Sequence, residues 1–187
     1  MIKRFTPYFM VSFILFSVFG CKDDVLPKPD GFLRLDYPIA SYKPFIADCP
    51  YGFYYNSKAE VKADKDCSYE IHYPRMKATV YLSYKPVNGN IEKLLKDAQK
   101  LTYEHVIKAD AITEQPYINR EKRVYGMFYS VGGNAATNSQ FYLTDSTKHF
   151  IHGSLYFYAK PNFDSIMPAA DYIKNDMQTL METMEWK

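Results

Sequence analysis

A short polar segment carries the residue types of a hydrolytic site, because Asp145, Ser146 and His149 lie within five positions of one another. A serine hydrolase needs a nucleophile on a sharp turn, a histidine base, an acid that orients the base, and donors for the oxyanion. Asp and Ser are also the residues that a turn between strands favours, and the sequence has no Gly-x-Ser-x-Gly motif. We therefore expect a turn here, and we predict that the protein is not an enzyme.

Histidines are the next candidates, as metal ligands. His149 and His152 are three positions apart on a predicted strand, where side chains at this spacing point to opposite faces and cannot converge on one ion. His105 falls on the apolar stripe of a predicted helix and is expected in the core. Gly132-Gly133-Asn134 lacks the lysine and the spacing of a phosphate-binding loop. The sequence therefore predicts no metal and no other cofactor.

Different chemistry is indicated at Cys21. It ends an uncharged apolar run from Phe9 to Gly20 that follows two basic residues, the pattern of a secretory signal too short to span a bilayer comfortably. Gly20 before the cysteine has the look of a bacterial lipobox, in which the thiol receives a diacylglycerol and the new amino terminus is acylated, for example with palmitate. Phe19 is bulkier than usual there, and an ordinary signal peptide or a signal anchor are alternatives. We predict a signal at 1–20 and lipidation of Cys21, whose several acyl chains would anchor the protein stably.

Residues 21–31 are predicted to form the lipidated tether. Lys22, rather than an aspartate, follows the acylated cysteine, and Asp23 and Asp24 come next. This arrangement resembles the export signal of some surface lipoproteins, although a solvated tether needs charge in any case. The membrane leaflet therefore stays open.

The remaining cysteines are Cys49 and Cys67. Outside the cytoplasm, with the third cysteine acylated, these two can oxidise together, and we predict a disulfide between them. A metal site or a reactive thiol is the alternative. Neither a Cys-x-x-Cys motif nor a neighbouring histidine cluster supports that alternative.

Composition limits the partners. The chain has 23 basic and 21 acidic residues, and two of the basic ones, Lys3 and Arg4, fall in the predicted signal, so residues 21–187 are formally neutral. A neutral domain gives no electrostatic case for nucleic acid. The 18 tyrosines fit either a β-rich core or an aromatic binding face.

Hydrophobic periodicity predicts strands and two helices. Alternating or short apolar runs predict strands at 32–37, 53–55, 68–73, 78–84, 112–117, 124–131, 139–144 and 149–159. A loop is expected around Tyr42 and a polar connection at 56–66. Apolar residues at helical spacing predict one helix from Asn90 to Ala109, and a second whose cap is Ser165 and whose first turn holds Pro168.

The order strands, helix, strands, helix predicts an α+β fold. We expect one small domain at 32–187, with a mostly antiparallel β-sheet packed by two amphipathic helices.

Several sequence strings resemble the gliding motility lipoprotein GldD family of Bacteroidota, and the likeness runs from Pro27 to Lys187. These strings are Cys49-Pro50-Tyr51, Leu82-Ser83-Tyr84-Lys85, Val124-Tyr125-Gly126, Gly133-Asn134-Ala135-Ala136, Gln140 to Phe150, Leu155-Tyr156-Phe157, Pro161-Asn162 and Leu180 to Lys187. The resemblance implies an accessory component of gliding, which in these bacteria depends on the type IX secretion machinery. It brings no active site to transfer. His152, where a basic residue is more usual, departs from the family pattern.

We therefore expect an envelope lipoprotein, anchored at the outer membrane on its periplasmic face or at the cell surface, that contacts proteins of the gliding and secretion machinery. The predicted contact residues lie at a hairpin tip: Tyr142, Asp145, Lys148 and His149. The alternative is a periplasmic or surface lipoprotein that binds a sugar or lipid in a pocket lined by tyrosines and Trp186.

Overall fold

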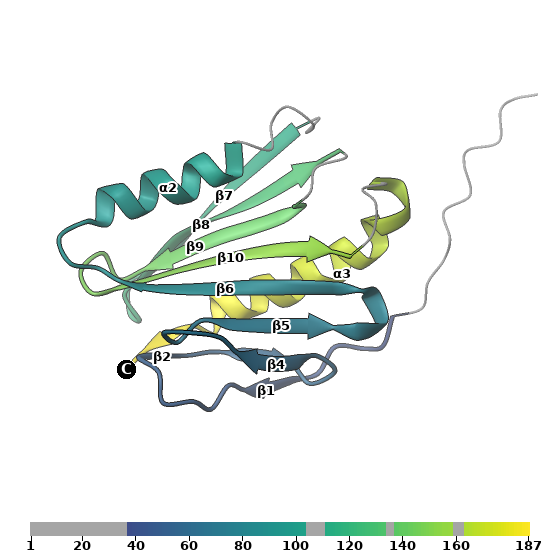
Figure 1. The fold of residues 1–187 in the computed structure, drawn as a ribbon, viewed down its shortest axis with the longest axis horizontal. Helices are drawn as coiled ribbons and strands as arrows, with labels where there is room; N and C mark the ends of the chain where they lie inside the picture. Colours follow the sequence, from purple (N-terminus) through teal and green to yellow (C-terminus); the bar gives the residue numbers. More distant parts are fainter. Residues whose placement is uncertain (1–36, 104–110, 134–136, 159–162) are drawn as a thin grey trace, which may run out of the picture. The chain divides into compact units, whose positions relative to one another are not determined.

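The structure is a computed structural model that describes residues 37–103, 111–133, 137–158 and 163–187 (Figure 1). The predicted signal, Cys21, the tether and the predicted strand at 32–37, apart from Tyr37, lie outside the described residues. Residues 104–109, at the end of the first predicted helix, lie outside them as well.

Seven antiparallel strands form the main sheet, in the order β4-β5-β6-β10-β9-β8-β7. Their bounds are β4 Glu60–Ala63, β5 Tyr69–Tyr73, β6 Ala78–Pro86, β7 Ala111–Asn119, β8 Val124–Gly132, β9 Ser139–Thr144 and β10 His149–Phe157. The predicted connection at 56–66 thus contains β4. β7 runs through Pro116 without a break because it is an edge strand, where a residue without an N–H can be accommodated.

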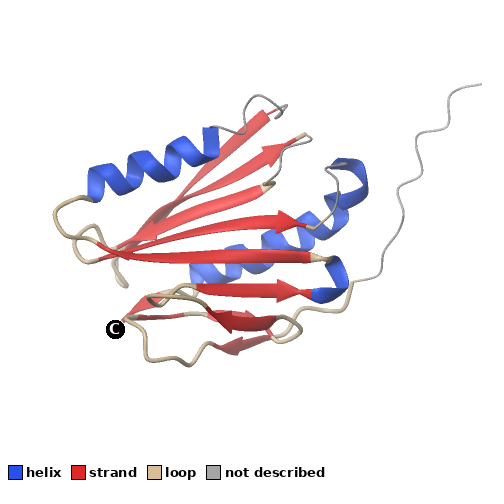
Figure 2. Cartoon of the chain, in the orientation of Figure 1, coloured by secondary structure: helices blue, strands red, loops and turns tan. Residues whose placement is uncertain are grey.

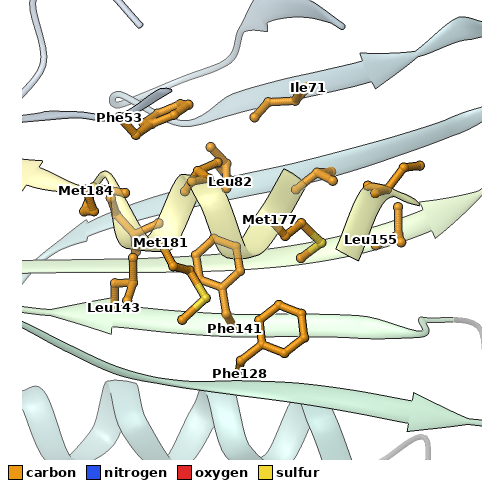
Figure 3. Close-up of a cluster of buried hydrophobic side chains, with 14 of the residues drawn as sticks. Phe53, Ile71, Leu82, Phe128, Phe141, Leu143, Leu155, Met177, Met181 and Met184 are labelled. Carbon is orange, nitrogen blue, oxygen red and sulfur yellow. The ribbon is translucent and has the colours of Figure 1, made fainter. Parts of the chain in front are cut away.

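Helix α3, Phe163–Glu182, covers one face of this sheet. Its apolar stripe, which includes Ile173, Met177 and Met181, is buried against Leu82, Leu143 and other side chains of the strands (Figure 3). The register leaves room for this packing at Gly153, where a Cβ would stand 2.3 Å from the ring of Phe141.

The start of α3 differs from the prediction. The helix begins before Ser165, so this residue is not its N-cap, and Pro168 lies inside the helix.

Helix α2, Ile91–Tyr103, lies on the opposite face (Figures 1 and 2). Leu94 and Ala98 pack with Val87 and Phe150 in a second, smaller core. Since Phe150 and Ile151 are consecutive on β10, their side chains point to opposite faces, which explains why the two cores are separate.

Two small two-stranded sheets complete the described part. β1, Tyr42–Pro44, pairs with β3, Tyr54–Asn56, so the predicted loop around Tyr42 contains a strand. β11, Glu185–Trp186, pairs with β2, Tyr51–Gly52. A disulfide joins Cys49 to Cys67, with their Cα atoms 5.7 Å apart, and links the start of β2 to the turn before β5. The predicted fold class, α+β with a mostly antiparallel sheet and two packing helices, is confirmed.

Candidate functional site

The segment that suggested a hydrolase forms the turn of the β9–β10 hairpin. Asp145 is buried, and its Oδ1 accepts hydrogen bonds from the backbone N–H groups of Thr147, Lys148 and His149 at 2.8–3.0 Å. Burial alone would raise the pKa of the Asp145 carboxyl group. These backbone donors outweigh it and lower the pKa to about 2. Asp145 is therefore a carboxylate that holds a turn closed.

His149 is held by different groups. Its ring stacks on Trp186 with 5.2 Å between centroids, and its Nδ1 lies 3.0 Å from the hydroxyl of Tyr84. The Asp145 carboxylate is bonded to backbone N–H groups and to the Thr147 hydroxyl, not to the imidazole. Because the acid does not orient the base, these residues do not form the hydrogen-bonded triad that hydrolysis requires.

The four predicted partner contacts occupy different environments. Tyr142 is half-buried and stacks on Phe150 beneath α2, with 5.8 Å between ring centroids. Asp145 and His149 have the intramolecular partners described above. Lys148 is exposed at the turn. The hairpin therefore presents Lys148 most directly to a partner, and the role of all four in binding stays a prediction.

A larger surface lies on the face of the sheet opposite α3, beyond the part that α2 covers. We call it the open face and define it by six side chains of β5, β6 and β10 and the residue after β10: Glu70, His72, Thr79, Tyr81, Tyr156 and Tyr158. They alternate with core residues such as Ile71 and Val80, which point toward α3. Tyr158 is the most exposed of the six, at 60%.

Hydrogen bonds connect four residues of the open face, and an ion-pair contact and a ring contact add the other two. The Tyr158 hydroxyl lies 2.9 Å from that of Tyr81 and 3.0 Å from Thr79 Oγ1. Thr79 Oγ1 also lies 3.0 Å from Nδ1 of His72, whose Nε2 is 2.8 Å from Glu70. Tyr156 packs edge-on against Tyr81. The three tyrosine rings are therefore held by one another and by Thr79.

The pKa values of two groups at or beside the open face, Tyr81 and His152, are shifted. The hydrogen bond with Tyr158, together with burial, raises the pKa of Tyr81 to about 12, so the Tyr81 phenol remains protonated at neutral pH. Next to the open face on β10, burial lowers the pKa of His152 to about 4, assisted by the positive charge of Lys85. His152 is thus a neutral imidazole, and its Nε2 has no hydrogen-bond partner among the described residues.

Sequence reasoning did not single out the open face. The signal was present, because Tyr81 and Tyr156 occupy the positions of alternating strands that would be polar in an ordinary half-exposed sheet. What the sequence could not supply was the strand order. The strand order of the folded sheet places β10 directly beside β6, although the two strands are far apart in the sequence.

Two kinds of site are not found in the described part of the chain. No group of three or more His, Cys, Asp or Glu side chains is placed to hold a metal ion there. Of the helices described, none is both long and apolar enough to cross a bilayer.

Comparison with known proteins identifies the family. The family model described as "Gliding motility lipoprotein GldD" matches residues 22–186, nearly the whole chain. No curated protein matches the sequence. The family description names a lipoprotein of gliding motility and no enzymatic activity, and it supports an association with the cell envelope. Because the match covers 165 of the 187 residues, the chain belongs to the gliding motility lipoprotein GldD family.

Proposed function

We propose that this gliding motility lipoprotein is an accessory component anchored in the outer membrane through lipidated Cys21, and that it works by contacting proteins of the gliding and type IX secretion machinery. The open face is the principal surface through which it contacts these proteins. The observation that carries this proposal is the cluster of Tyr81, Tyr156 and Tyr158 on a sheet whose other face packs on α3.

The chemistry of the open face suits a protein partner. Tyrosine combines a large apolar ring with a hydroxyl that can bond across an interface, and it is enriched where proteins meet. The rings are held by one another and by Thr79, so binding would cost little additional side-chain entropy. The partner surface should offer hydrogen-bond acceptors and apolar contact, with a positive group opposite Glu70.

Crosslinking in intact cells tests the contact. The variant Tyr156→Ser/Tyr158→Ser should abolish spreading motility and the recovery of machinery proteins with the full-length lipoprotein. Tyr54→Ser is the matched control, because Tyr54 is 47% exposed but lies outside the open face. Wild-type spreading and recovery in the double variant, at wild-type protein level, would refute the open face as the contact surface.

The anchor has its own test. Cys21→Ser should remove metabolic palmitate labelling and release the protein from the membrane fraction. Protease treatment of intact cells then distinguishes the two sides of the membrane, since only a surface-exposed domain is digested. A Cys21→Ser protein that behaves as wild type in labelling and fractionation would contradict the lipid anchor.

A further inference from the structure

A cavity of about 390 Å³ lies on the α3 side of the main sheet, between the first half of α3 and the ends of β5, β6 and β10. Its volume is within the range of small-molecule sites. The 13 lining residues come from four places: Tyr37 and Pro38, Lys58, the turn at 73–77 with Phe157, and Ser165, Ile166, Ala169 and Tyr172 of α3.

The wall is mostly apolar and aromatic. Tyr37 stacks on Tyr172 with 5.2 Å between ring centroids, and Tyr73, Met76 and Ile166 add further apolar surface. Burial strongly raises the pKa of the Tyr73 hydroxyl. The interior therefore suits an apolar chain better than a sugar, whose hydroxyl groups would need many polar partners.

The mouth carries charge of one sign. Lys58, Arg75 and Lys77 line the cavity and are exposed, and no acidic residue is among the described lining residues. None of the three cationic side chains pairs with an acid in the described part of the chain. The buried carboxyl group of Asp176 accepts hydrogen bonds from Tyr42 and Asn56 at 2.8 Å, and it forms no ion pair with any of the three cations in the described part of the chain.

Lys77, one of the three cations, has an unusual backbone conformation. The 3-10 turn η1, Pro74–Met76, ends at Lys77, which adopts the left-handed conformation with φ of 49°. Glycine is the residue that this conformation favours, and a lysine there is strained. The strained position thus carries a long cationic side chain beside two other cations.

We propose that this cavity binds an amphiphile that has an acyl chain and an anionic headgroup, either a carboxylate or a phosphate. The acyl chain lies among Tyr73, Tyr172 and Ile166, and the headgroup meets Arg75, Lys77 and Lys58. Tyr37 and Pro38 are part of the wall and are also where the described chain begins. The 16 residue-to-residue steps from Cys21 to Tyr37 can span at most about 55 Å, which keeps the cavity within reach of a bilayer that holds a lipidated Cys21.

Photolabelling tests the proposal on the full-length lipidated protein in phosphatidylcholine nanodiscs. Three probes carry a diazirine in the acyl chain: a fatty acid, phosphatidic acid and phosphatidylcholine. Labelled peptides containing Tyr73–Lys77 or Ile166–Tyr172 are expected with one or both anionic probes, and the comparison of these two shows whether the headgroup is a carboxylate or a phosphate. Equal labelling by phosphatidylcholine would overturn the anionic requirement.

Charge reversal provides the second measurement. Lys58→Glu/Arg75→Glu/Lys77→Glu should lower anionic labelling by about tenfold, the effect of losing charge-assisted contacts. The matched control reverses three exposed lysines elsewhere, Lys62→Glu/Lys93→Glu/Lys96→Glu, and should label as wild type. Unchanged labelling in the first variant would overturn the proposal.

The chain's own tether is the competing occupant, since it contains Val25 and Leu26 between charged residues. Ile166→benzoylphenylalanine places a crosslinker at the cavity. Capture of added lipid supports the proposal, and capture of residues 22–36 in the presence of lipid overturns it.

Discussion

The two faces of the main sheet are built from the same alternating strands but differ in burial and in the kind of contacts they make. Toward α3, Leu143, Ile151 and Leu155 are completely buried and contact other apolar side chains. On the open face, Tyr158 is 60% exposed and polar groups bond to one another. We therefore expect the side that packs on α3 to contribute more to stability than the open face.

The largest effect should come from the face that packs on α3. Ile151→Ala is expected to cost about 2–5 kcal/mol in the free energy of unfolding, because it removes buried apolar atoms and leaves a cavity. Urea denaturation measures it. Ser83→Ala, on the neighbouring strand but exposed on the other face, should change stability by less than about 0.5 kcal/mol. Equal losses in both variants would remove the distinction between the faces.

The disulfide borders the same core, and its loss should rank second. Cys49→Ser/Cys67→Ser is expected to cost about 3 kcal/mol, mainly by enlarging the set of unfolded conformations. Melting temperatures with and without reductant provide the measurement. The wild type should lose stability on reduction, and the double variant should not respond.

Asp145 allows a test by pH. Its carboxyl pKa is lowered to about 2 in the folded protein from an ordinary value of 3.8. The stabilisation is therefore fully present above pH 3.8 and is lost as the pH falls toward 2. Asp145→Asn keeps the acceptor oxygen but loses the charge, and should cost about 1 kcal/mol at neutral pH. A variant with the same acid-induced loss between pH 4 and 2 as the wild type would assign that loss to other groups.

The smallest effect is expected on the open face. Tyr158→Phe removes the hydroxyl that Tyr81 and Thr79 share and should cost about 0.5 kcal/mol, because the side chain is exposed. The pKa of Tyr81, about 12 in the wild type, should fall because its first cause is that hydrogen bond. Ultraviolet titration of tyrosinate follows this change, and Tyr54→Phe serves as the control. If Tyr158→Phe lowers the free energy of unfolding more than Ile151→Ala does, the α3 side does not contribute more to stability than the open face.

Local pattern predicted much of the fold. Period-two alternation located the central strands, and the apolar stripes located α2 and α3. The local pattern failed where pairing with another strand determines the secondary structure. β4 is a short polar strand that exists because β5 offers it an edge, with Val61 opposite Ile71. Tyr42 is in a strand because β3 pairs with it and Asp176 accepts its hydroxyl proton in a hydrogen bond.

The sites were harder to predict than the elements. The turn chemistry of Asp145 follows from residue type, since Asp bonds readily to nearby backbone N–H groups. The open face and the cavity depend on strand order and on the approach of segments distant in sequence. Lys58 and Lys77 line the cavity together with residues of α3. No local sequence pattern predicts that these segments lie side by side.

The pairing of β11 with β2 has a consequence for biogenesis. Trp186 lies opposite Tyr51, and the backbone N–H of Lys187 donates to the carbonyl of Pro50, so the final residues close against the beginning of the described fold. Trp186 and Tyr51 are 135 positions apart in the sequence. This pairing therefore forms only after the intervening chain has been synthesised, and until then the edge of β2 has no strand partner to close it.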